Sequence, residues 1–65
     1  MSHVDRMKIE LHELRSKINA LNIFILEGEI YNTLDGVEQL DMVKQLALME
    51  AYEDVLSVRI GRASE

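Results

Sequence analysis

The sequence predicts an all-α fold, in which two amphipathic helices form an antiparallel hairpin that oligomerises into a four-helix bundle or a larger helical assembly. Both halves of the chain carry apolar residues at alternating spacings of three and four, which is the period of a helix and not of a strand. No proline interrupts either half. Gly28 and Asp35 stand between the halves, and residues of these types commonly end and begin helices. We therefore expect residues 1–65 to form a single helical-hairpin domain.

The first helix is predicted over about residues 4–27. Ile23 and Phe24 lie off its main stripe, so one partner helix cannot cover its C-terminal half. The helix is expected to end at Gly28, because glycine readily takes the left-handed conformation after a last helical turn. The main stripe is a heptad seam of the kind that packs along another helix. Its members are Val4, Met7, Leu11, Leu14, Ile18, Leu21 and Ile25.

Residues 28–35 are predicted to form the loop. Ile30, Tyr31 and Leu34 supply it with three apolar side chains, which favours a helical turn folded back over the end of the hairpin. Asp35 is a good N-cap for the second helix, and Glu38 three residues later fits a capping-box pattern.

The second helix is predicted over about residues 36–60. Gly61 is expected to end it, which leaves residues 61–65 as a frayed tail. Its seam is interrupted by Glu53, and a second stripe flanks the seam. The seam residues are Met42, Leu46, Met49, Leu56 and Ile60, and the flanking residues are Leu48, Tyr52 and Val55.

The small size of the chain indicates self-association. A hairpin of 65 residues buries little of its surface, and without cysteine neither disulfides nor zinc thiolates can stabilise it. We predict a homodimer or a higher homo-oligomer. The expected interface residues are apolar positions outside the seams, namely Ile23, Phe24, Leu48, Tyr52 and Val55.

Composition excludes several classes of partner. A net charge of -5 argues against binding of duplex nucleic acid, which requires a basic face. The apolar run 21–26 is too short for a membrane span, and the N-terminus lacks the pattern of a secretory signal. We expect a cytoplasmic protein.

The sequence carries no motif for catalysis or metal binding. His3 and His12 are nine residues apart, on opposite sides of an ideal helix, and the second helix has no histidine for a Glu-x-x-His di-iron motif. Phosphate-binding glycine loops, nucleophile elbows and cysteine nucleophiles are also missing. We therefore predict no enzyme activity, no metal and no cofactor.

A few residues are candidates for ligand binding. Tyr31 combines an aromatic face with a hydroxyl in a loop, although a plug over the hairpin end is the alternative interpretation. Lys44, Arg59 and Arg62 could form an anion pocket if oligomerisation brings them together, and otherwise are ordinary surface charges.

The chain resembles a group of very small phage and prophage proteins that are also helical hairpins. More loosely, its aromatic loop followed by an acidic helix start is similar to the hairpin of the phage anti-CBASS and anti-Thoeris sponges, which sequester cyclic nucleotide signals. The resemblance covers about half of the chain. The segments that carry it are Ile30-Tyr31-Asn32-Thr33-Leu34, Glu38-Gln39-Leu40, Gln45, Met49-Glu50-Ala51-Tyr52, Val55-Leu56 and Arg59-Ile60.

The resemblance implies a function. Members of the sponge family oligomerise and hold their ligand between subunits with a loop aromatic and with basic and hydroxyl groups. Tyr31 matches the aromatic, Lys44 lies near the position of the basic residue, and Thr33 is a weaker match. The family's polar pair is replaced here by Asp41-Met42.

Two functions follow as hypotheses. The first is a phage-type protein that sequesters a cyclic oligonucleotide to counter host defence, with Tyr31 stacking on a base and Lys44 and Arg59 meeting phosphates. The second is a helical protein–protein interaction module or inhibitor, whose apolar face docks on a host or viral partner, such as a host defence protein.

Overall fold

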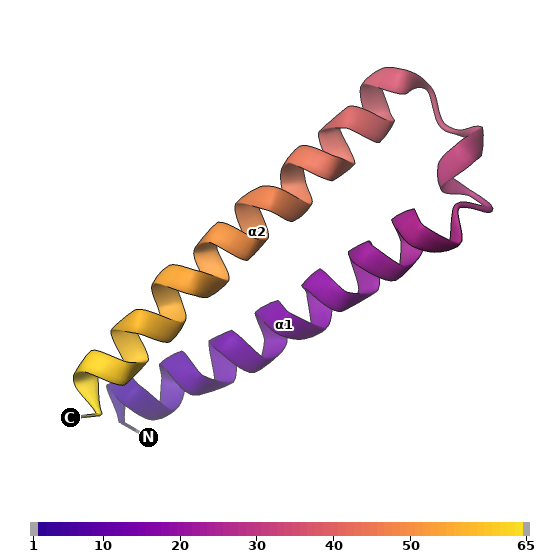
Figure 1. The fold of residues 1–65 in the computed structure, drawn as a ribbon. Helices are drawn as coiled ribbons and strands as arrows, with labels where there is room; N and C mark the ends of the chain where they lie inside the picture. Colours follow the sequence, from indigo (N-terminus) through magenta and orange to yellow (C-terminus); the bar gives the residue numbers. More distant parts are fainter. Residues whose placement is uncertain (1, 65) are drawn as a thin grey trace.

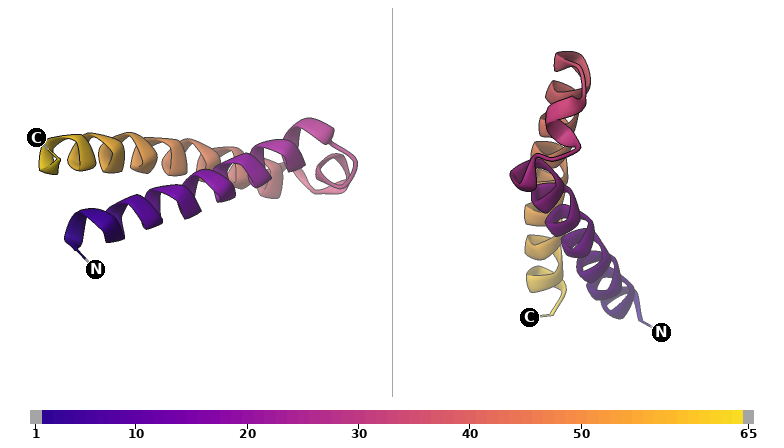
Figure 2. Two further views of the ribbon diagram at one scale, coloured as in Figure 1. Left: turned by 90° about the horizontal axis from the view of Figure 1, so that it is seen from below. Right: turned by 90° about the vertical axis from the view of Figure 1, so that its right-hand side faces the viewer.

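The computed structural model describes residues 2–64 as one antiparallel helical hairpin (Figure 1). Helix α1 spans His3–Glu27, the short 3-10 helix η1 spans Tyr31–Thr33, and helix α2 spans Gly36–Ala63. Both ends of the chain lie at one end of an elongated molecule and the loop lies at the other, and the two helices cross at an angle (Figures 1 and 2). Within residues 2–64 there is no strand, so the predicted all-α hairpin is confirmed.

Helix α1 begins and ends with defined caps. The backbone N–H of Asp5 donates to the side-chain oxygen of Ser2 at 3.1 Å, which makes Ser2 the N-cap. At the other end Gly28 has a φ of 71°, and its N–H donates to the carbonyl of Phe24 at 3.3 Å. Gly28 therefore ends the helix as predicted, in the left-handed conformation that glycine tolerates best.

Helix α2 begins where the sequence predicts and ends later. The N–H of Glu38 donates to Oδ1 of the N-cap Asp35 at 2.8 Å. At the C-terminal end, however, the helix continues through Gly61 to Ala63. Gly61 keeps a negative φ, and Arg62 and Ala63 after it are good helix formers. The predicted helix end at Gly61 and the frayed tail over 61–65 are therefore corrected for residues 61–63; Glu65 lies outside the described residues.

The core lies toward the end that carries the chain termini. Leu56 is fully buried at 0% exposure and packs in one cluster with buried residues of α1. In the half near the loop the seam residues, Leu21 and Leu46 among them, are only half-buried. Every member of the cluster occupies a predicted seam position. The buried residues are Met7, Leu11, Leu14 and Leu56, and the partly buried residues around them are Val4, Ile18, Met49 and Ile60.

Glu53, the polar residue in the seam of α2, has its partner on α1. Nε of Arg15 donates to Oε2 of Glu53 at 3.0 Å, across 38 positions of sequence. The Arg15 side chain is 57% exposed and that of Glu53 is 31% exposed, so water screens this ion pair. The pair joins one turn of α1 to one turn of α2 and adds little stability.

A double-mutant cycle of Arg15→Ala and Glu53→Ala tests that assignment. We expect a coupling free energy below about 1 kcal/mol, because exposed ion pairs contribute little. Most of it should disappear in concentrated salt, which screens the two charges. Urea unfolding at low and high salt measures both quantities. A coupling of several kcal/mol that persists in salt would contradict this account.

Candidate functional site

Tyr31 fastens the loop to the start of α2. Its hydroxyl donates to the carbonyl of Gln39 at 3.4 Å, and Nε2 of Gln39 donates back to the carbonyl of Tyr31 at 2.8 Å. The ring is half-buried. These bonds agree with the plug interpretation of Tyr31, because they use its hydroxyl within the hairpin. The part of the ring that remains accessible is what could stack on a ligand.

Thr33 lies beside Tyr31 in η1. Its hydroxyl donates to the carbonyl of Ile30 at 2.6 Å, and its N–H donates to the same carbonyl at 2.9 Å. The donor of the Thr33 hydroxyl is therefore committed to the loop, while the oxygen, in an exposed residue, keeps a lone pair for other contacts.

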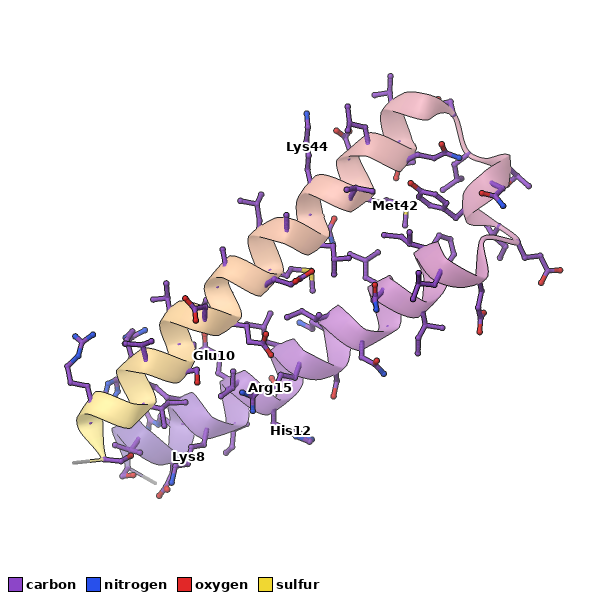
Figure 3. The ribbon with its side chains drawn as sticks, viewed as in Figure 1. Lys8, Glu10, His12, Arg15, Met42 and Lys44 are labelled. Carbon is purple, nitrogen blue, oxygen red and sulfur yellow. The ribbon has the colours of Figure 1, made fainter. Side chains whose placement is uncertain are left out.

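Lys44 and Arg59 are exposed on α2, and one copy of the chain does not bring them together. Lys44 points away from α1 (Figure 3). Arg59 follows fifteen residues later, about 22 Å farther along the axis at 1.5 Å per residue. Lys44 is also about 140° around the helix from Gln39, the residue that holds Tyr31. Within one hairpin, only Tyr31 and Thr33 of the four candidate ligand residues are neighbours.

Lys44 and Arg59 have no acidic partner among residues 2–64. In this part of the chain Arg15–Glu53 is the one side-chain ion pair within 4.0 Å. The charges of Lys44 and Arg59 are consequently available to an external anion.

An exposed apolar surface surrounds Lys44 on the side of α2 that faces away from α1. It consists of residues three, four, seven, eleven or fourteen positions from Lys44, which share its helix face. Val37 is 73% exposed, Leu48 is 72% exposed and Val55 is 57% exposed. We call this surface the outward face of α2. Its members are Val37, Leu40, Lys44, Ala47, Leu48, Ala51, Val55 and Val58.

Sequence reasoning found the outward face only in part. It selected Leu48 and Val55 as a flanking stripe but missed the continuation through Val37, Leu40 and Val58. The signal was a second run of three- and four-residue spacings in the same helix, on the side opposite the seam. The broad apolar composition of this helix concealed that there are two separate stripes.

The predicted interface residues are distributed over both helices. Leu48 and Val55 belong to the outward face, and Tyr52, 43% exposed, lies at its edge. Ile23 is equally exposed on α1, at 43%. Phe24 is half-buried, so it offers less free surface than the sequence suggested.

The best-formed cavity in the described part of the chain is shallow and acidic. It measures about 70 Å³ and lies where α1 meets the loop, between Phe24, Glu27, Glu29 and Ile30. Two carboxylates and no cation line it, so its charge repels an anion.

No three acidic or histidine side chains of residues 2–64 gather closely enough to hold a metal ion. His12 is exposed and points away from α2 (Figure 3). Neither α1 nor α2 combines the length and apolar character that a membrane span needs.

Comparison with known proteins assigns the chain to a family. The sequence model of the Sequestin family matches residues 1–62. The chain belongs to the Sequestin family. No curated protein and no solved structure matches it. The Sequestin match covers α1, the loop and all of α2 except Ala63, and it includes Tyr31, Thr33, Lys44 and Arg59.

Proposed function

We propose that this Sequestin is a non-enzymatic, phage-type binding protein that oligomerises and sequesters a small anionic signal, a cyclic oligonucleotide, in the host cytoplasm to counter host defence. The family name supports a sequestering role. The observation that carries the proposal is Lys44, an exposed cation with exposed apolar residues of the same helix face on both sides of it. Such a surface offers van der Waals contact to a base and a charge-assisted hydrogen bond to its phosphate.

The ligand site is proposed to form between copies of the chain. Small-molecule pockets usually enclose roughly 300–1,000 Å³. The acidic cavity beside Phe24, at about 70 Å³, is far smaller than that. A hairpin with two helices side by side has little means of enclosing a nucleotide by itself. Contact between copies supplies the missing walls.

Each candidate residue has a role in this proposal. Lys44 and Arg59 pair with phosphates, the accessible part of the Tyr31 ring stacks on a base, and the Thr33 oxygen accepts a hydrogen bond. Tyr31 keeps its bonds to Gln39 in this arrangement, so the loop is already organised before the ligand binds. That organisation reduces the entropy lost on binding.

Calorimetry against a panel of cyclic di- and trinucleotides tests the proposal. We expect one ligand class to bind and Lys44→Gln to weaken it by about ten- to a hundredfold, the value of a charge-assisted hydrogen bond. The matched control is Lys8→Gln, which makes the same change of charge on α1, near the chain termini (Figure 3). Its affinity should stay near that of the unmodified chain.

Two further variants examine Tyr31. Tyr31→Phe keeps the ring and should retain binding, whereas Tyr31→Ala should lose stacking, with circular dichroism to establish that the hairpin remains folded. If no cyclic nucleotide produces heat, the sequestration proposal fails. If Lys8→Gln weakens binding as much as Lys44→Gln, the ligand responds to overall charge and the assigned site is wrong.

The exposed outward face of α2 also favours the second candidate function, a helical module or inhibitor that docks on a host or viral protein. In that case a pull-down from host lysate should return one dominant protein. Capture should survive Lys44→Glu, because apolar contact would supply most of the affinity. Loss of capture with Lys44→Glu, or an empty pull-down, would count against this function.

A further inference from the structure

The outward face of α2 is long enough to be an interface. From Val37 to Val58 it extends over 21 residue steps, about 32 Å along the helix. Its large apolar side chains are 53% to 73% exposed at Val37, Leu40, Leu48, Val55 and Val58. Soluble monomers rarely expose a continuous apolar stripe of this length.

The shape of the face suits another helix. Its three- and four-residue spacings follow the ridge of a helix, as in helix–helix contacts generally. Ala47 and Ala51 lie at its middle, where two helix axes can approach closely because no long side chains separate them. Larger residues, Val37 and Leu40 at one end and Val55 and Val58 at the other, flank this closest point.

The charges at the two ends of the face favour one orientation. Glu38 and Asp41 accompany its N-terminal end, and Arg59 and Arg62 accompany its C-terminal end. Two copies of α2 that run antiparallel place each acidic end against the partner's basic end. Parallel copies would instead place like ends together. Antiparallel helix dipoles favour the same choice.

We propose that the outward face of α2 is the contact with a second copy of this chain, whose α2 runs antiparallel, with Ala51 near the two-fold axis. In this register Lys44 lies beside Arg59 of the partner subunit, and Asp41 lies beside Arg62 of the partner subunit. The contact between the two copies does not depend on the proposed function; only the identity of the anion bound there rests on it. The dimer unites two cations that are about 22 Å apart in one copy, so each half of the contact gains a basic site suited to a phosphate.

The same register also brings like charges together. Lys44 repels Arg59 of the partner subunit until an anion lies between them. A second pair of like charges supplies a test of orientation. On the other flank of the face, Glu50 comes near Asp54 of the partner subunit. Asp54→Lys should therefore tighten an antiparallel dimer. In a parallel dimer Asp54 would instead lie near Arg59 of the partner subunit, five positions on, as in parallel coiled coils. The same variant would then weaken the dimer.

Light scattering and sedimentation test the interface. The chain alone has a mass of 7.5 kDa and should run as a dimer. Leu48→Glu should raise the dissociation constant by about thirtyfold or more, as for a central apolar contact residue. Leu26→Glu, on α1 at a residue 75% exposed, is the matched control and should leave the dimer intact. A monomeric unmodified chain, or a dimer that is insensitive to Leu48→Glu, overturns the proposal.

Cysteine cross-linking tests the register even if Leu48→Glu unfolds the hairpin. Ala51→Cys should form a disulfide-linked dimer, and a mixture of Ala47→Cys and Val55→Cys chains should cross-link with each other. Efficient self-linking of Leu40→Cys would show parallel pairing and overturn the assigned orientation. A dimer that binds no cyclic nucleotide would refute sequestration and leave the interface standing. A monomer that binds one would refute the interface and the site between copies, and would leave sequestration standing.

Discussion

Replacement of Leu56 by alanine should be the most destabilising single change in the core. Leu56 is the one described side chain that is fully buried, at 0% exposure, and it packs against Met7, Leu11 and Leu14. Removing its three terminal carbons leaves a cavity that a small hairpin can fill only by moving its helices. We expect a loss of about 2–5 kcal/mol in the free energy of unfolding. This is a large part of the stability of any small domain.

Thermal melting followed by circular dichroism measures the effect. In a domain of this size 1 kcal/mol corresponds to a shift in Tm of roughly 4–8 °C, so Leu56→Ala should melt at least about 8 °C lower. Leu26→Ala is the matched control, because Leu26 is 75% exposed and should change stability by no more than about 0.5 kcal/mol. All samples need one concentration, since self-association would make Tm depend on it. Equal effects of the two variants would place the core elsewhere.

Gly28→Ala and Gly61→Ala should change stability in opposite directions. Gly28 has a φ of +71°, and a Cβ there would lie 2.8 Å from Nδ2 of Asn32. The Asn32 amide can rotate away, so most of the cost is the left-handed backbone, about 1–2 kcal/mol for a residue with a side chain. Gly61 lies within helix α2 with nothing within 4 Å of its Cβ position. Alanine there should stabilise the helix by up to about 1 kcal/mol.

Urea unfolding of the two variants checks these signs. The substitution is identical, so the difference between the two variants reports the backbone conformation of each glycine and, at Gly28, the contact with Asn32. Stabilisation by Gly28→Ala would mean that the loop does not require a left-handed residue at this position. A clear loss with Gly61→Ala would show that α2 ends at Gly61 after all.

The fold was predictable because its determinants are local. The seam from Val4 to Ile25, the glycine at 28 and the N-cap at Asp35 each act within a turn or two of helix, and the structure uses all of them as expected. The end of α2 was predicted wrongly at Gly61, because a glycine near a helix end permits the helix to end there but does not require it. Whether the last turn continues depends on the residues that follow and on the hydrogen bond from Ser64 to the Ile60 carbonyl.

The candidate site was predictable by residue type and not by arrangement. Tyr31, Thr33, Lys44 and Arg59 could be selected as groups that stack on bases or bind phosphates. Their separation, with Tyr31 held against Gln39 and Lys44 on another side of α2, emerges only when the loop is folded onto the helix. A list of suitable side chains carries no information about which of them share a surface.

By itself, the sequence determined two capped helices, a turn between them and the stripes along which they pack, since helical periodicity and capping are properties of neighbouring residues. The tertiary structure decided what depends on distant residues. Arg15 forms an ion pair with Glu53, the polar residue in the seam of α2, and burial is greatest around Leu56. An apolar face of α2 remains exposed on the side away from α1. One helix can cover only one side of another. The second stripe of α2 becomes a surface for binding only once α1 has occupied the first.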